Sequence, residues 1–276
     1  LLCSRVAGGV EVSSLYQKHG FKEPSSYESE GDSLASSDPV RAVYCYVLAQ
    51  NAEKAAKVAV EHAGQVLSAN QAGKMADLFK MFKYIGSASI HSLETKLKSE
   101  VLAYAAYLGG IQASWKGYGD ITIVLYRTAL SIISHQNLSL PFNAQLLELH
   151  ETASLLKKNP GEYVQKLAKL SVSGINGASK YQQTVLEQYE LGNMIQDPTE
   201  AKRLGKNQIQ VVGETLPINC NQSNERTSIF TETRIKGPAI TLEDTTSCIT
   251  HAEALMWAEV NQFSPLNTGH RINPYQ

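Results

Sequence analysis

Four residues near the C-terminal end of the sequence are of types that bind zinc: Cys220, Cys248, His251 and His270. Two residues separate Cys248 from His251, which is a spacing that zinc ligands use, and the other two could complete a tetrahedral set. Structural zinc sites normally supply two close-spaced ligand pairs, whereas this sequence shows one. We therefore favour ordinary structural roles for these residues and keep a zinc-containing module as the alternative.

No motif in the sequence supplies a catalytic nucleophile. The pattern Gly-x-Ser-x-Gly does not occur, and the seven histidines are scattered without a His-Glu-x-x-His arrangement. We predict that the chain is not an enzyme and uses no cofactor. An unrecognised enzyme that uses the C-terminal Cys and His residues is the competing hypothesis.

Aromatic residues are the candidates for binding a partner, because Trp and Tyr are enriched at interface hot spots. Trp115 lies among glycines, where it favours a role in closing the end of a helical pair. Trp257 is the better docking candidate, because it belongs to a C-terminal segment with little apolar surface of its own. Phe263 and Tyr275 follow in the same segment.

Composition excludes several classes of partner. The 276 residues carry 25 Lys and Arg against 26 Asp and Glu, so no basic excess supports nucleic-acid binding. No apolar run approaches the ~18 residues that a membrane-spanning helix needs. The four cysteines are far apart and fit free thiols in a reducing compartment, which favours a cytoplasmic location.

Helical periodicity dominates residues 39–196. Asp38 followed by Pro39 is a helix-start signal, and Gln50-Asn51 and Gly109-Gly110 are predicted to break helices. Apolar residues recur at spacings of three and four in these stretches: 43–47, 55–66, 75–82, 93–108, 120–134, 142–156, 163–170 and 179–194. Short helices that each carry an apolar stripe are typical of an array whose members bury one another.

We therefore predict an all-α, tetratricopeptide-like helical-hairpin array (an α-solenoid), with a closed helical bundle as the alternative. Residues 1–38 form an N-terminal segment whose Ser-rich, acidic part, 22–39, is expected to be a loop or linker. Residues 39–196 form the helical-repeat domain. Residues 197–276 form an irregular segment with β-prone pieces at 208–212 and 228–235.

One short helix is predicted within the irregular C-terminal segment. Thr250 and Glu253 form a capping box that begins this helix, and the helix ends near Asn261. The rest of the segment is rich in turn residues, so we expect it either to pack along the helical array or to dock on a partner.

Two stretches resemble a known class of protein. Residues 39–67, PVRAVYCYVLAQNAEKAAKVAVEHAGQVL, resemble the helical hairpins that follow β-propellers in large WD-repeat scaffolds of the ciliary-transport and coat type. Residues 253–275, EALMWAEVNQFSPLNTGHRINPY, are similar to the C-terminus of the WD-repeat-containing protein seventeen family.

The resemblance implies a non-catalytic scaffold subunit. Its partners would be the other proteins of a larger assembly, and its location would be the cytoplasm or the cilium. Because the sequence begins without Met, we expect it to be a piece of a longer chain, with a β-propeller before residue 1.

Overall fold

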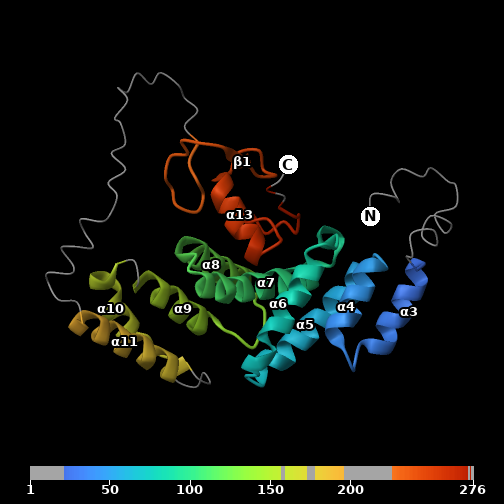
Figure 1. Cartoon of the computed structure of the whole chain (residues 1–276), viewed down its shortest axis with the longest axis horizontal. Coiled ribbons are helices and arrows are strands. Elements are labelled where there is room, and N and C mark those ends of the chain that lie inside the picture. Colours follow the sequence, from blue (N-terminus) through green and yellow to red (C-terminus); the bar gives the residue numbers. More distant parts are fainter. Residues whose placement is uncertain (1–21, 157–158, 173–177, 196–225, 273, 275–276) are drawn as a thin grey trace.

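A computed structural model of the chain shows a row of α-helices that follow one another in sequence order (Figure 1). The structure describes residues 22–156, 159–172, 178–195, 226–272 and 274. The helices of the row are α3 (Pro24–Leu34), α4 (Pro39–Leu48), α5 (Ala52–Ser68), α6 (Met75–Ile85), α7 (Thr95–Lys116), α8 (Gly119–Gln136), α9 (Ala144–Leu156), α10 (Pro160–Lys169) and α11 (Ala178–Ile195). Short 3-10 turns at Ala72–Lys74 and Ile90–Ser92 precede α6 and α7.

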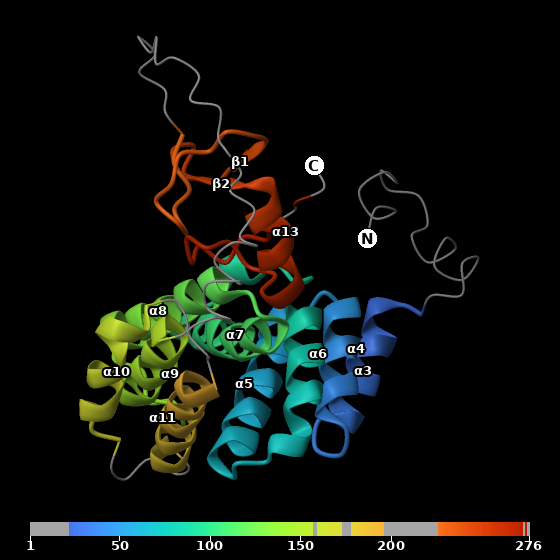
Figure 2. The same cartoon turned by 60° about the vertical axis from the view of Figure 1, so that its left-hand side comes forward.

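Each helix of the row packs mainly on helices one or two positions away in the chain. Helix α4 contacts both α5 and α6, α5 contacts both α6 and α7, and α9 contacts both α10 and α11. This pattern is that of stacked helical hairpins and confirms the predicted all-α helical-repeat array. Within the described residues, α3 and α11 lie at opposite ends of the row and do not pack extensively on each other, as the ends of a closed bundle would (Figures 1 and 2).

Side-chain caps begin helices where the sequence predicts them. The Asp38 carboxylate accepts a hydrogen bond from the Arg41 amide at 3.1 Å, and Pro39 occupies the first turn of α4. The Asn51 side chain caps α5 in the same way, and Gln50 before it has a φ of 60°. The helix predicted over 120–134 is also confirmed, as α8.

The prediction of a loop or linker over 22–39 is wrong, because most of this stretch is helix α3. Its acidic side chains pair with basic residues of the next two helices. Glu30 lies 2.6 Å from the Arg41 guanidinium, and Asp32 lies 2.7 Å from the Lys54 ammonium. These partners lie 11 and 22 residues away in sequence, so local composition does not show them.

Helix α3 also packs closely on α4. A Cβ placed at Gly31 would lie 2.8 Å from the Tyr46 ring, so glycine is what permits this approach. The Tyr46 hydroxyl donates a hydrogen bond to the Asp32 carboxylate at 2.8 Å. Burial, together with this bond, raises the pKa of Tyr46 to about 12. Residues 24–34 therefore belong to the helical array.

The predicted break at Gly109-Gly110 is also wrong, because α7 continues to Lys116 and ends at Gly117, which has a φ of 78°. A Cβ at Gly110 would lie 2.6 Å from the Tyr126 ring of α8. A glycine inside a helix costs roughly 1 kcal/mol relative to alanine. Here its missing side chain allows α7 and α8 to form the most extensive contact between two helices of the described chain.

Residues 226–272 and 274, which we call the tail, lie on top of α7 and α8 (Figures 1 and 2). The tail contains helix α13 (His251–Val260) and an antiparallel pair of strands, β1 (Ala239–Thr241) and β2 (Cys248–Thr250), in which Ile240 pairs with Ile249. The predicted capping box at the start of α13 is present, and Asn261 follows its last residue.

The β-prone pieces of the sequence do not supply these strands. Residues 208–212 lie outside the described residues. Residues 228–235 contribute isolated bridges through Ser228 and Arg234 instead of a strand.

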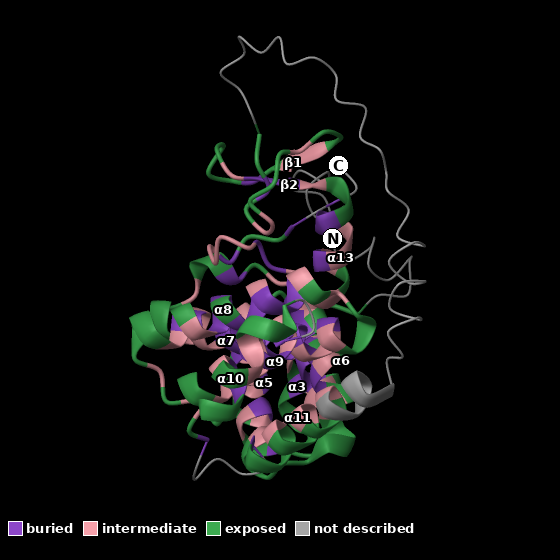
Figure 3. Cartoon of the chain, turned by 90° about the vertical axis from the view of Figure 1, so that its left-hand side faces the viewer, coloured by how far each residue is buried: buried purple, intermediate pink, exposed green. Residues whose placement is uncertain are grey.

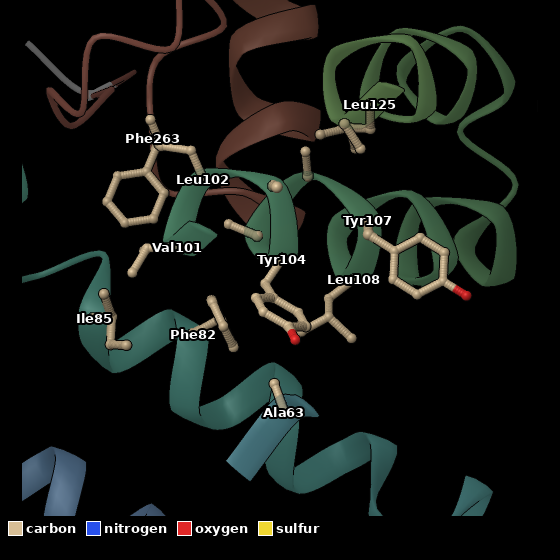
Figure 4. Packing of buried hydrophobic residues seen from close by; sticks show 14 of the residues in the cluster. Ala63, Phe82, Ile85, Val101, Leu102, Tyr104, Tyr107, Leu108, Leu125 and Phe263 are labelled. Carbon is tan, nitrogen blue, oxygen red and sulfur yellow. The ribbon is translucent and has the colours of Figure 1, made fainter. Parts of the chain in front are cut away.

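The tail shares the core of the array. Its residues Leu242, Ile249, Trp257, Phe263 and Ile272 belong to the same buried cluster as the residues of α4 to α8. Figure 4 shows Phe263 beside Val101 of α7. The tail therefore packs along the helical array, which is one of the two outcomes expected from the sequence.

Buried residues follow the inner faces of the helices and surround α7, while the outer turns are exposed (Figure 3). A second, smaller cluster joins α9, α10 and α11 through Leu149, Leu167 and Ala178. Among the helices that the structure describes, none has the length and apolar character needed to cross a membrane.

Candidate partner-binding groove

Trp115 is the most exposed of the large hydrophobic side chains in the described chain, with 68% of its surface accessible. It lies in the last turn of α7, where the edge of its indole meets Phe79 of α6 at a centroid distance of 5.3 Å. It thus contacts the neighbouring helix at the end of α7, but most of its surface remains exposed. An exposed Trp beside structured neighbours is instead available to a partner.

The other two described aromatic candidates lie in the core. Trp257 is 0% exposed and Phe263 is 1% exposed. The Trp257 Nε1–H donates a hydrogen bond to the Phe263 carbonyl at 2.7 Å, and the indole stacks on Phe230 at 4.9 Å. The structure thus brings these two residues together inside the tail, where they offer no surface to a partner. Tyr275 lies outside the described residues.

The candidate zinc ligand Cys248 lies in strand β2 and is buried. Its Sγ is 3.8 Å from the Thr241 hydroxyl and 3.7 Å from the Thr246 carbonyl. Cys220 lies outside the described residues. The contacts of Cys248 are those of a small buried side chain.

The two candidate histidines have partners of other kinds. A ring nitrogen of His251 lies 3.0 Å from the Pro274 carbonyl. The His270 ring stacks on His91 at 5.4 Å with an interplanar angle of 2°. Over the described ranges, no group of three or more His, Cys, Asp and Glu residues is arranged to hold a metal.

A groove of about 690 Å³ opens beside Trp115, and four helices line it. Helix α7 supplies Trp115, α8 supplies Tyr126, α9 supplies His150, and α11 supplies Tyr181 and Tyr189. Among the described residues that line it there is no Asp, Glu, Lys or Arg. We call this feature the Trp115 groove.

Stacked rings form the floor of the Trp115 groove. His150 stacks on Tyr126 at 5.3 Å and meets Tyr181 at 4.9 Å. Tyr126 in turn contacts Tyr107 of α7 at 6.4 Å. The rings therefore connect α7, α8, α9 and α11, which holds the two walls of the groove together.

Burial keeps the floor of the groove uncharged. It lowers the pKa of His150 to about 4, because an imidazolium loses its hydration there, and it raises the pKa of Tyr126 well above its ordinary value. Both side chains are therefore neutral at physiological pH. These rings contact one another by stacking and tilted packing, and the His150 backbone carbonyl accepts a hydrogen bond from the Ser154 hydroxyl at 2.9 Å.

A second hollow, of about 650 Å³, lies at the turns of the first hairpins and differs in chemistry. Glu28 and Glu53 are among its lining residues, and their carboxylates are paired with Lys54 at 2.9 Å and Lys57 at 2.6 Å. Glu94 lines this hollow as well, but none of its described lining residues is aromatic, so it is a weaker candidate for a binding hot spot than the Trp115 groove.

Sequence reasoning identified Trp115 but not the other residues of the groove. Tyr181, Val185 and Tyr189 recur every four residues along α11, so their spacing places them on one helical face. This spacing could therefore have identified one wall of the groove from the sequence. His150 carries no such signal, because its position between two tyrosine rings depends on how α8, α9 and α11 pack.

Comparison with known protein families finds no family model that matches the sequence, and no solved structure matches the chain.

Proposed function

We propose that this chain is a non-catalytic scaffold for protein–protein interaction, and that the Trp115 groove receives a segment of a partner protein. The observation that carries the proposal is a Trp side chain with 68% of its surface exposed, at the edge of an aromatic groove whose described lining residues carry no charge. Exposed aromatic anchors beside a preformed hollow are typical of binding hot spots.

The architecture supports the same role. A row of helices that pack mainly on near neighbours presents a long surface, and proteins of this kind bind partners along it. The sequence resemblance suggests the finer form of the function: a subunit of a larger trafficking or ciliary assembly in the cytoplasm, with a propeller elsewhere in the same chain.

Affinity capture with matched variants tests the proposal. The wild-type chain, Trp115→Ser and Tyr44→Ser are each used to capture proteins from the same extract. Tyr44 is the matched control, because it is an exposed aromatic residue, 43% accessible, on α4 and does not line the groove. Circular dichroism verifies that each variant is folded.

We expect the wild type and Tyr44→Ser to capture the same set of proteins, and Trp115→Ser to lose it. Capture of one set by all three chains would remove the groove from the interaction. Capture of nothing specific by any of them would contradict the scaffold role.

A further inference from the structure

We infer that a separate hollow beside Trp115 binds an acidic segment of the partner protein, with one large apolar side chain in the hollow and carboxylates on its rim. The hollow has a volume of about 240 Å³ and lies between α6, α7 and the tail. We call it the Lys80 hollow. The inference rests on the proposed function, because it specifies the chemistry of the partner segment. Three features lead to it: an apolar floor, a surplus of positive charge and a position next to Trp115.

Buried side chains form the floor of the Lys80 hollow. Phe82 of α6 is 6% exposed, and Leu108 of α7 and Phe263 of the tail are each 1% exposed. Sites for small molecules typically have volumes of about 300–1,000 Å³, so this hollow is smaller than most of them. Its size and its apolar floor suit a single large apolar side chain, which is stabilised there by losing contact with water.

Two lysines of α6, Lys80 and Lys83, form the rim of the Lys80 hollow. Both are exposed, and because they lie three residues apart they share one face of the helix. Among the described lining residues Glu259 is the one acidic side chain, and its carboxylate is bonded to the Lys116 ammonium at 2.6 Å and the Tyr118 hydroxyl at 2.9 Å. Three ammonium groups thus lie at this site with one carboxylate, which leaves a surplus of positive charge.

The charges of Lys80 and Lys83 are not neutralised within the described chain. Neither ammonium lies within ion-pair distance of a described carboxylate, including that of Asp77 on the preceding turn of α6. The Lys80 ammonium lies 5.9 Å from the centre of the Tyr84 ring, which attracts it without cancelling its charge. Carboxylates of a partner would therefore gain two counter-ions here, which favours an acidic segment over a neutral or a basic one.

The number of these charges favours a peptide over a nucleic acid. Nucleic-acid binding depends on many neutralised phosphates, whereas this surface offers two unpaired ammonium groups beside the Glu259 carboxylate. The whole chain carries 25 basic against 26 acidic residues, so no wider basic surface supplements them. A short acidic peptide segment needs only a few such contacts, because its apolar side chain adds the energy of filling the floor.

Trp115 lies between the Lys80 hollow and the Trp115 groove. Its ring meets that of Phe79, which lines the hollow, at a centroid distance of 5.3 Å. Gln112, one turn earlier on α7, also lines the hollow, whereas Ile111 and Ser114 line the groove. A partner segment that leaves the groove past Trp115 therefore enters the Lys80 hollow.

Peptides of defined charge test the occupant. The probe is fluorescein-labelled Glu-Glu-Phe-Glu-Glu, titrated with the whole chain and followed by anisotropy. Labelled Gln-Gln-Phe-Gln-Gln controls for charge, and labelled Glu-Glu-Ala-Glu-Glu controls for the apolar anchor. Labelled oligothymidine represents a polyanion of another class.

Matched double variants locate the binding. Lys80→Gln/Lys83→Gln removes both charges of the rim. Lys166→Gln/Lys169→Gln is the control, because these lysines are also exposed and three residues apart on a helix, α10, and do not line the hollow. Lys80→Glu/Lys83→Glu reverses the charge of the rim and is titrated with labelled Lys-Lys-Phe-Lys-Lys as well. Circular dichroism verifies that each variant is folded.

We expect saturable binding of the acidic peptide to the wild type, at least about five-fold tighter than binding of either control peptide. Lys80→Gln/Lys83→Gln should weaken it by about five-fold or more, as for two exposed ion pairs, whereas Lys166→Gln/Lys169→Gln should leave it unchanged. The charge-reversed variant should bind the lysine peptide more tightly than the acidic one. Raising the salt from about 50 to about 500 mM should weaken binding to the wild type, because exposed charges are screened.

Four results would overturn the inference: no saturable binding of the acidic peptide, equal effects of the two glutamine variants, an unchanged preference of the charge-reversed variant, or tighter binding of oligothymidine. Capture from extract separates the two levels of the argument. If capture depends on Trp115 but not on Lys80 and Lys83, the scaffold role stands and this inference fails. If peptide binding depends on the two lysines but capture does not depend on Trp115, the Lys80 hollow stands as a binding site and the Trp115 groove fails.

Discussion

Replacing Gly110 with alanine tests whether the middle of α7 depends on a glycine for packing. An added Cβ would lie 2.6, 2.8 and 3.1 Å from three carbons of the Tyr126 ring. Carbon atoms in contact normally lie about 3.5–4.0 Å apart, so the ring would have to move by about 1 Å. It cannot move freely, because His150 stacks on it at 5.3 Å and Tyr107 lies at 6.4 Å.

Two opposing effects set the magnitude for Gly110→Ala. Forcing extra volume into a packed core typically costs about 1–3 kcal/mol of unfolding free energy. The better helix propensity of alanine offsets roughly 1 kcal/mol of this loss in unfolding free energy. We therefore expect a net loss of about 1 kcal/mol, together with weaker binding in the Trp115 groove, because Tyr126 forms part of its floor.

Gly161→Ala is the matched control for this experiment. Gly161 also lies in a helix, α10, but a Cβ there meets nothing within 4 Å. Alanine at this position should leave stability unchanged or raise it by up to about 1 kcal/mol. Urea denaturation followed by circular dichroism measures both variants. If they change the free energy of unfolding equally, or if Gly110→Ala is the more stable, the close-packing argument is refuted.

Three further predictions concern the groove and the tail. Between pH 6.5 and 4 unfolded His150 binds a proton that the folded chain does not, so stability falls as the pH is lowered. Measured by urea denaturation over this pH range, the wild type should lose about 2–3 kcal/mol more free energy of unfolding than His150→Phe. Equal losses would contradict a lowered pKa of His150 in the folded chain. Trp257→Phe should cost about 1–3 kcal/mol, because it removes the bond to the Phe263 carbonyl, whereas exposed Trp115→Phe should stay within about 0.5 kcal/mol. Dialysis against EDTA should leave the thermal unfolding temperature unchanged, and a fall of several degrees would instead support the zinc-containing module.

Most helices of the row could be predicted because their signals are local. An apolar stripe and a cap, such as Asp38 or Asn51, lie within one or two turns of each other in the sequence. Helix α3 could not be found in this way. It has little apolar surface, and Glu30 and Asp32 pair with basic residues of the two helices that follow.

The exposure of the two tryptophans could not be predicted from the sequence either, because it also depends on contacts with other parts of the chain. Trp257 is buried because Phe230 and Phe263 close over it within the tail. Trp115 lies in the last turn of α7, contacts Phe79 of α6 and is 68% exposed. Phe230 and Phe79, which contact Trp257 and Trp115, lie 27 and 36 residues away in sequence, so local spacing does not show either environment.

The tail and the Trp115 groove are supported by the same end of α7. A Cβ at Gly109 would lie 3.0 Å from the Val260 carbonyl of the tail. The next residue, Gly110, faces Tyr126 on the floor of the groove. Next to Trp115, the Lys116 ammonium lies 2.6 Å from the Glu259 carboxylate of α13, and the Tyr118 hydroxyl donates to the same carboxylate at 2.9 Å. These contacts hold the last turn of α7 against the tail, so the tail stabilises the position of the groove's exposed anchor even though its own aromatic residues are buried.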